Sequence, residues 1–285
     1  MKRKLLGEDS KSFPPCPICE AQVRPYYDHS DADIYECGNC SHVFSDTRTI
    51  HQEEYGPEYY EIVHRNWFAN PNRPLFKKIE EIARGRGANA SVFDVGCGNG
   101  DLLKFLRSRN PGMELIGVEL SDLPKSEGIR FIKSDIFELN LDQKFDLVVT
   151  LAVIEHVGDV RAFVEKLARF LKPGGKLVAM TLNGDSLIYR IARFGKSSVW
   201  PDPFNRLYSH HHLHHYTRAS LNELMKKSGL KICAHESHNF PLAAVDFPSK
   251  GAIADKMQLG GIALLFGLGR LFDMAFLQTI VCERE

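Results

Sequence analysis

The stretch that most constrains the fold is residues 92–100, Val-Phe-Asp-Val-Gly-Cys-Gly-Asn-Gly. Its first four residues form a short, mostly apolar run, which is typical of a buried parallel strand. A G-x-G-x-G turn follows, and residues 101–107 then repeat apolar side chains at helical spacing. A strand, a glycine turn and a helix in this order indicate half of a nucleotide-binding α/β unit, in which glycines let the backbone close on a ligand.

Two carboxylates flank this turn. Glu119 ends a second predicted strand at residues 115–119, where an acid can accept hydrogen bonds from two ribose hydroxyls. Asp94 lies just before the glycines. A helix N-terminus favours an anion, so an added carboxylate beside it suits a ligand that carries positive charge. S-adenosylmethionine carries a sulfonium and an ammonium, whereas a pyrophosphate carries neither.

The run from Asp94 to Gly100 resembles the first motif of class I S-adenosylmethionine-dependent methyltransferases, and Glu119 matches their ribose-binding acid. The resemblance covers essentially the whole chain and is firmest over residues 90–181. It implies a Rossmann-like α/β fold with a doubly wound, seven-stranded, mostly parallel sheet. In the family, the residue at Asp135 contacts the adenine amino group, and its apolar neighbour covers the ring. The implied cofactor-binding residues are Asp94, Gly96, Cys97, Gly98, Asn99, Gly100, Glu119, Leu120, Asp135, Ile136 and Leu151.

Four cysteines precede this region as two C-x2-C pairs separated by fewer than twenty residues. The pairs are Cys16 with Cys19 and Cys37 with Cys40, a spacing that fits a four-thiolate zinc site. Four protein ligands leave no open position, so the predicted zinc is structural and replaces a core that so short a segment cannot build. His29 and His42 are surplus to this site and are predicted to lie at the surface.

The remaining elements follow from periodicity and turn residues. A helix capped by Asn72 precedes the first strand, and Asp159 caps another. A capping box of Ser220 and Glu223 is predicted to begin a helix over residues 221–227. Leu-Lys-Pro-Gly-Gly at 171–175 is predicted to form a turn. Further strands are predicted at 129–132, 145–151, 176–181, 230–233 and 277–282.

These elements divide the chain into four predicted regions: a zinc-ribbon module over 1–50, a linker with N-terminal helices over 51–88, the methyltransferase core over 89–240, and an insertion with the last strand over 241–285. Aromatic residues gather in the linker, including Tyr55, Trp67 and Phe68. They either pack the zinc ribbon against the core or form a lid over the pocket. A zinc ribbon followed by Tyr-Gly-Pro-Glu-Tyr-Tyr also resembles the N-terminal module of zinc-ribbon-bearing small-molecule methyltransferases.

Several residues are candidates for catalysis. His156 follows the fourth strand, where ligands of a doubly wound sheet bind, and its ordinary pKa near neutrality suits a general base. It could equally shape the cofactor pocket, and Glu155 beside it is predicted to serve structure or cofactor positioning. A histidine-rich run after the fifth strand supplies His214, His215 and Tyr216 as alternates. That run either orients an acceptor, caps the next helix or, least expected, binds a metal.

Composition narrows the partners and the compartment. Lys and Arg together number 36, as do Asp and Glu, so the zero net charge gives no reason to expect nucleic acid as the partner. The basic residues 1–6 lack a following apolar stretch, so no secretory signal is expected. Seven cysteines, four of them in paired spacing, argue against a disulfide framework and predict a reducing, cytoplasmic location. The oligomeric state is not indicated.

An apolar segment at residues 259–269 interrupts the end of the chain. It is shorter than a bilayer span, and Arg270 and Asp273 close it. We expect a buried or pocket-covering helix, with an interfacial membrane helix as the lesser alternative.

The sequence therefore predicts an enzyme that transfers a methyl group from S-adenosylmethionine to an oxygen, nitrogen or carbon of a small molecule. One alternative is a ribosomal RNA base methyltransferase, which the balanced charge disfavours. Another is a non-catalytic zinc-ribbon adaptor, which the intact motif residues disfavour.

Overall fold

The computed structural model describes residues 13–28, 32–46, 65–122, 125–195, 201–208, 212–246 and 251–285. Its strands are β1 (Val23–Asp28), β2 (Asp33–Cys37), β3 (Val43–Ser45), β4 (Ser91–Val95), β5 (Glu114–Glu119), β6 (Ile129–Lys133), β7 (Phe145–Leu151), β8 (Leu171–Leu182), β9 (His214–His215), β10 (Leu230–His238) and β11 (Leu277–Arg284). Its α-helices are α1 (Arg65–Ala69), α2 (Arg73–Arg84), α3 (Asp101–Arg109), α4 (Val160–Arg169), α5 (Leu187–Gly195), α6 (Pro201–Leu207), α7 (Arg218–Lys227) and α8 (Ala252–Leu271). Two 3₁₀ turns, η2 (Ile154–His156) and η3 (Leu242–Ala244), complete the elements used below.

Seven strands form the central sheet in the order β10-β11-β8-β7-β4-β5-β6. Neighbours from β8 to β6 pair in parallel, and β11 runs antiparallel to both β8 and β10. The chain order reverses between β4 and β7, and ligands of such sheets bind beyond the carboxyl ends of the strands at this point. The predicted doubly wound, seven-stranded, mostly parallel sheet is confirmed.

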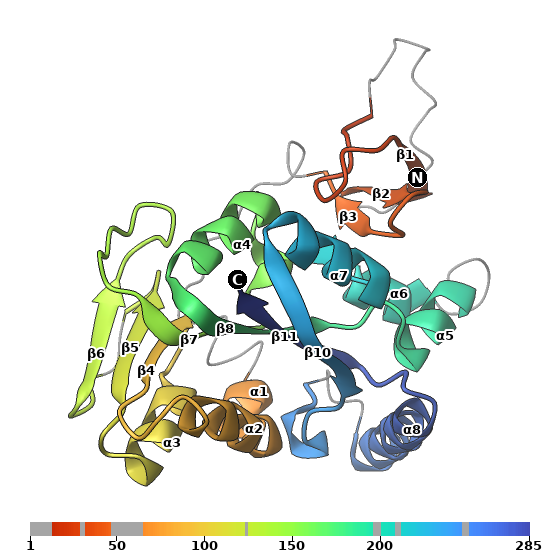
Figure 1. The fold of residues 1–285 in the computed structure, drawn as a ribbon. Helices are drawn as coiled ribbons and strands as arrows, with labels where there is room; N and C mark the ends of the chain where they lie inside the picture. Colours follow the sequence, from red (N-terminus) through yellow and green to blue (C-terminus); the bar gives the residue numbers. More distant parts are fainter. Residues whose placement is uncertain are drawn as a thin grey trace.

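Helices cover both faces of this sheet, with α4 and α7 on one side and α1, α2 and α3 on the other (Figure 1). Successive side chains of a strand point to opposite faces, so β4 contributes to both cores. Phe93 and Val95 pack with α4 and α7, whereas Val92 packs with α2 and α3. Burial on both faces explains why these strands read as nearly continuous apolar runs.

The N-terminal strands form a second, antiparallel sheet in the order β1-β2-β3-β9 (Figure 1). Its fourth strand comes from the histidine-rich run, with Val43 paired to His215 and Phe44 to His214. The main-chain N–H of Ser45 also donates to the carbonyl of Leu213 at 2.9 Å. The zinc-ribbon module is therefore completed by a segment of the methyltransferase core, which no local pattern predicted. The four predicted region boundaries stay a prediction.

Three local expectations are wrong. His42 is fully buried instead of lying at the surface, because its ring packs between Phe44 and Tyr216 and contacts His214. The cap of α7 is Thr217, which forms a capping box with Ser220, whereas Glu223 lies within the helix. Residues 171–175 belong to β8, where a register shift opposite Phe145 accommodates the glycines. His29 and Tyr55 lie outside the described residues.

The fourth correction concerns the apolar segment. It is part of α8, a helix of 20 residues that is long and apolar enough, by length and composition, to cross a membrane. Only 11% of its most apolar window is buried, so it is neither short nor a buried core helix. Its N-terminal half was missed because Asp255 and Lys256 break the apolar run without breaking the helix. The caps at Asn72 and Asp159 are confirmed, at 3.3 Å to the N–H of Leu75 and 3.0 Å to that of Ala162.

Candidate active site

The turn between β4 and α3 adopts a backbone that only glycine accepts easily. Gly96, Gly98 and Gly100 have φ values of +73°, +50° and +71°, which lie in the left-handed region. A Cβ on Gly96 would lie 2.3 Å from Cγ2 of Val153, in the loop after β7. The turn is also held to β5, because the N–H groups of Gly96 and Cys97 donate to the carbonyl of Val118. Conformation therefore favours glycine at all three positions, and at Gly96 the lack of space requires it as well.

A pocket opens beside this turn at the carboxyl ends of β4 and β7. Its lining joins the turn with the ends of β7 and β8 and with the α1–α2 region. The lining residues are Trp67, Phe68, Asn70, Pro71, Asn72, Leu75, Phe76, Asp94, Gly96, Cys97, Gly98, Asn99, Asp101, Leu102, Leu151, Met180 and Phe240. Six predicted cofactor residues, Asp94, Gly96, Cys97, Gly98, Asn99 and Leu151, thus meet in one cavity.

Asp94 is a buried carboxyl at the inner end of this pocket. Burial, aided by the nearby negative charge of Glu119, raises its pKa to about 8. A buried carboxylate is costly unless a positive charge or several donors stabilise it. The ammonium or sulfonium of S-adenosylmethionine supplies such a charge, so the chemistry of Asp94 fits this cofactor and not an anionic one.

Glu119 stands at the end of β5 with its carboxylate over the glycine turn. One oxygen accepts the N–H of Gly98 at 2.8 Å, and the other accepts the N–H of Leu120 at 2.8 Å. These bonds fix the orientation of the carboxylate and leave further lone pairs on both oxygens for ribose hydroxyls. Both oxygens can therefore still accept ribose hydroxyls. Glu119 lies outside the lining of the pocket, so ribose binding by Glu119 stays a prediction.

Asp135 and Ile136 follow β6 at the same edge of the sheet. Asp135 accepts the N–H of Phe137 at 2.8 Å, which shapes the turn, and Ile136 is buried in the core on the α4 side. The side chain of Leu120 is exposed. None of these three lines the pocket beside the turn, so their contact with adenine stays a prediction.

An aromatic wall faces the glycine turn, and the sequence predicted only part of it. Trp67 and Phe68 come from α1, and Phe240 comes from the segment after β10, with its ring 5.1 Å from that of Trp67. Asp246 accepts the N–H groups of Asn66 and Trp67, which holds α1 in place. Of the two predicted roles for Trp67 and Phe68, this position supports a lid over the pocket rather than packing of the zinc ribbon against the core. Phe240 lacked any local signal because its partner lies more than 170 residues away in the chain.

The loop after β7 carries Glu155 and His156. Ala152 begins it with a φ of +56°, a conformation that non-glycine residues seldom adopt. Glu155 is buried, accepts the hydroxyl of Thr181 at 2.8 Å, and burial raises its pKa to about 7. The structural role predicted for Glu155 fits this placement. His156 is half-buried, and its ring centroid lies 5.1 Å from that of His212.

The other three candidates lie deep at the junction with the zinc ribbon. His214 contacts His42 through Nδ1 at 3.0 Å and the carbonyl of Val157 through Nε2 at 3.0 Å, and burial lowers its pKa to about 4. His215 contacts the hydroxyl of Tyr189, and the hydroxyl of Tyr216 donates to the carbonyl of Ile154. All three are buried and hold contacts within the protein, so the geometry gives them positioning roles. Neither they nor the half-buried His156 line the pocket. A catalytic role for them stays an untested prediction.

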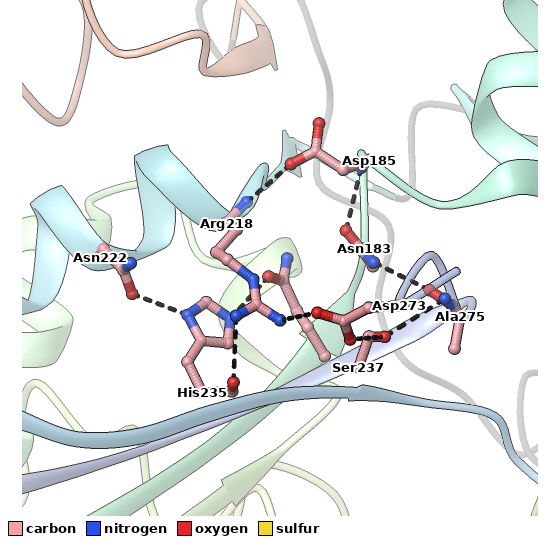
Figure 2. A network of polar contacts seen from close by, with 9 residues as sticks. Asn183, Asp185, Arg218, Asn222, His235, Ser237, Asp273 and Ala275 are labelled. Atoms are coloured by element: carbon pink, nitrogen blue, oxygen red, sulfur yellow. Dashed lines mark hydrogen bonds and ion pairs between the residues drawn. The ribbon is translucent and has the colours of Figure 1, made fainter. Parts of the chain in front are cut away.

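A polar network holds the segment after β8 against the end of the sheet (Figure 2). Asp185 accepts the N–H of Arg218 at the start of α7, and the guanidinium of Arg218 donates to Asp273 at 2.9 Å. Asn183 donates to the carbonyl of Ala275 at 2.8 Å. This network joins the edge of the site to the turn between α8 and β11.

The four predicted zinc ligands are brought together. Their sulfur atoms all lie within 4.8 Å of one another, with Cys16–Cys40 at 3.6 Å and Cys19–Cys37 at 3.5 Å. Tetrahedral zinc with Zn–S bonds of about 2.3 Å places its sulfurs roughly 3.8 Å apart. The donor set and its spacing therefore fit a structural zinc ion. Among the described residues this is the single cluster with ligand geometry, so the metal alternative for the histidine run gains no support.

Comparison with known proteins agrees with this geometry. A family described as "Methyltransferase domain" matches residues 64–235, more than half of the chain. A ubiquinone biosynthesis O-methyltransferase from Xanthomonas axonopodis is 28% identical over 67% of this chain and 86% of its own length. The relative of the same name from Rickettsia akari is 30% identical, but the match spans only half of its length.

A solved structure shows the same fold. The putative sarcosine dimethylglycine methyltransferase from Galdieria sulphuraria has a TM-score of 0.51 and is 14% identical, over 75% of this chain and 86% of its own. The glycine turn, the two carboxylates and the strand order thus have one explanation. The chain is an S-adenosylmethionine-dependent small-molecule methyltransferase and belongs to the methyltransferase domain family.

Proposed function

We propose that this enzyme methylates a ring hydroxyl of a small aromatic molecule and that His156 takes up the hydroxyl proton. The observation that carries the proposal is the position of His156, half-buried in the 3₁₀ turn η2, five residues along the chain from Leu151, which ends β7 and lines the pocket. Relatives named for O-methylation in ubiquinone biosynthesis support oxygen as the acceptor atom. The aromatic lining of the pocket supports a ring as the carrier of that oxygen.

The chain has to supply alignment, exclusion of water and a place for the proton. S-adenosylmethionine supplies a methyl group on a positively charged sulfur, which is already a good leaving group. Asp94 balances the positive charge of the cofactor, and Glu119 orients its ribose. Trp67, Phe68 and Phe240 form an apolar wall that suits an aromatic ring and keeps water out.

The proton of the acceptor requires a base, because a phenol is a weaker nucleophile than its phenolate. As the oxygen–carbon bond forms and the carbon–sulfur bond breaks, the hydroxyl proton moves to a ring nitrogen of His156. General-base assistance of this kind contributes about 10²–10⁴-fold to the rate. Glu155, buried against Thr181, keeps η2 in position and has a structural role.

The test is transfer of a labelled methyl group to matched ring acceptors that carry a hydroxyl or an amine. We expect methylation of the hydroxyl compound and a fall in kcat of about 100-fold in His156→Gln. The cofactor Kd of this variant, measured by calorimetry, should stay within about threefold. Thr181→Val, which removes the bond to Glu155, is the control for indirect damage to η2. Preference for the amine, or full activity in His156→Gln, would overturn the proposal.

A further inference from the structure

Helix α8 presents an unusually apolar face to solvent. Ile253, Met257, Leu264 and Leu271 are 79%, 73%, 64% and 74% exposed, and Leu268 is also exposed. Their spacing of three, four or seven residues places them on one side of the helix. Gly260 and Gly261, also exposed, lie between Met257 and Leu264 on the same side. The result is an apolar stripe that runs the length of a 20-residue helix, about 30 Å.

The opposite side of α8 is fixed to the domain. Phe266 is buried, with its ring 5.2 Å from that of Phe240, the aromatic residue of the pocket wall. Gly269 lies so close to the following turn that a Cβ would meet the carbonyl oxygen of Met274 at 2.7 Å. The helix therefore has one buried side and one apolar side that nothing in the described chain covers.

The C-terminal end of α8 is held by side-chain contacts to the rest of the domain, and these contacts limit how the helix can orient on a bilayer. Asp273 contacts Arg218 and accepts the hydroxyl of Ser237, and Ala275 accepts the side-chain N–H of Asn183 (Figure 2). Strand β11 then enters the central sheet at Leu277. A helix that crossed a bilayer would have to break these contacts and leave the sheet. The connections instead keep α8 lying along the surface of the domain.

The charges around the stripe favour an anionic surface. Lys256 and Arg270 are exposed at its borders, near the two ends of the helix. The one acidic residue of α8, Asp255, lies on the opposite side, about 160° around the helix from Met257. Apolar side chains bordered by cations are the pattern of helices that lie in the interface of an anionic bilayer.

The size of the stripe argues against a second copy of this chain. A face about 30 Å long and about 10 Å wide offers roughly 300 Å², whereas a standard stable interface buries about 800 Å² on each partner. A bilayer has no such minimum, because each inserted side chain contributes on its own. Helix α5, which packs against α8, carries a further exposed ring, Phe194, which is 90% exposed.

We infer that α8 is a membrane-docking helix, which lies in the interface of an anionic bilayer with Ile253, Met257, Leu264 and Leu271 inserted among the lipids. The inference goes beyond the proposed acceptor and does not depend on it. It has one structural consequence. The rings of Phe266, Phe240 and Trp67 connect α8 to the aromatic wall, so docking places the pocket beside the membrane surface.

Flotation of the full chain with vesicles tests this inference, with phosphatidylglycerol–phosphatidylcholine vesicles as the probe and pure phosphatidylcholine vesicles for comparison. We expect the wild type to float with the anionic vesicles. Met257→Glu with Leu264→Glu should lower the partition coefficient by more than about 100-fold, because two charges then enter the apolar layer. Both side chains face solvent, so the melting temperature and the cofactor Kd should not change.

Two further variants separate charge from apolar insertion. Lys256→Glu with Arg270→Glu should weaken binding to anionic vesicles by at least about 25-fold, at roughly fivefold for each cation, and change binding to neutral vesicles little. Phe13→Glu, at an exposed apolar residue of the zinc-ribbon module, is the matched control and should float as the wild type does. Wild type that stays unbound, or the Met257–Leu264 double variant floating normally, would overturn the inference. So would a stable dimer in solution that this double variant dissociates.

Discussion

The donor turn and the ribbon junction are built in opposite ways. In the donor turn, residues 94–100, the chain folds back on itself within a few positions and needs glycine at three of them. In the ribbon junction, residues 42–45 meet residues 213–216 across the whole length of the core. The first region carries its geometry in local sequence, whereas the second depends on the completed fold. Local motifs such as the donor turn can therefore be predicted from the sequence, whereas contacts such as the ribbon junction cannot.

The stability of the two regions also depends on pH with opposite sign. Asp94 has its pKa raised to about 8, so without cofactor it is stable as the neutral acid. His214 has its pKa lowered to about 4, so it is stable as the neutral base. Lowering the pH therefore stabilises the folded donor turn, because Asp94 becomes neutral, and destabilises the ribbon junction, because His214 becomes charged. The cofactor removes the first effect because its positive charge pairs with the carboxylate.

The largest expected effect is that of zinc loss, which should unfold the zinc-ribbon module and leave the donor turn folded. Removal of zinc by a chelator, or Cys37→Ser, should cost the module an apparent binding free energy on the order of 10 kcal/mol. We expect amide protection in β1, β2 and β3 to disappear in hydrogen exchange, because four strands this short have little core of their own. Calorimetry should still detect cofactor binding. Unchanged protection without zinc would contradict this account.

The second prediction breaks the donor turn and spares the ribbon. Gly96→Ala places a Cβ at a φ of +73° and into contact with Val153, which should cost at least about 2 kcal/mol and weaken cofactor binding more than 30-fold. Gly158→Ala is the control, since no atom lies within 4 Å of the added Cβ. Zinc content measured by elemental analysis should stay unchanged. Normal cofactor affinity in Gly96→Ala would show that the turn tolerates a side chain.

The third prediction sharpens the pH comparison at Asp94. The folded pKa lies above the unfolded value of about 3.9, so the fold loses stability as pH rises from about 4 to about 8. Asp94→Asn should therefore stabilise the cofactor-free protein at pH 8 by a few kcal/mol and have little effect at pH 4. The same variant should bind the cofactor poorly. Thermal unfolding at both pH values measures the difference, and a destabilised variant at pH 8 would refute it.

The stability of the ribbon junction should change with pH in the direction opposite to that of the donor turn. The folded pKa of His214 lies below the ordinary value of 6.5, so stability is lost as pH falls from about 6.5 to about 4. After correction for the intrinsic rate, amide exchange at β3 and β9 should become faster between pH 7 and pH 5. Exchange at β4 in the cofactor-free protein should become slower. Parallel changes in both regions would contradict the comparison.

The smallest effect concerns Thr217, the N-cap residue that lies between the ribbon junction and α7. Thr217→Ala removes the observed cap and should cost about 1 kcal/mol, whereas Glu223→Ala should change the free energy of unfolding by less than about 0.5 kcal/mol. Denaturant unfolding of both variants measures the difference. Equal losses would mean that the cap contributes nothing beyond helix propensity.

The sequence predicts the central sheet, the donor turn and the cysteine cluster because each has a local or short-range signature. Gly96 and Glu119 are separated by one strand and one helix, and the geometry of that unit is nearly invariant. The pairing of Phe44 with His214 has no such signature, since a two-residue strand gives no periodicity. His42 was misplaced for the same reason. The place of Phe240 in the pocket wall and the exposure of one face of α8 depend on which elements pack against them in the finished fold. No residue spacing in the sequence predicts either feature.

Calorimetric titration of S-adenosylmethionine into the wild type and into Glu119→Ala tests the central claim most directly. The claim is that the glycine turn and its two carboxylates hold the cofactor. We predict micromolar binding to the wild type and a loss of more than about 100-fold in the variant, because both ribose hydroxyls and the N–H of Gly98 lose their acceptor. Equal affinity of the two proteins, or no binding by the wild type, would contradict the account.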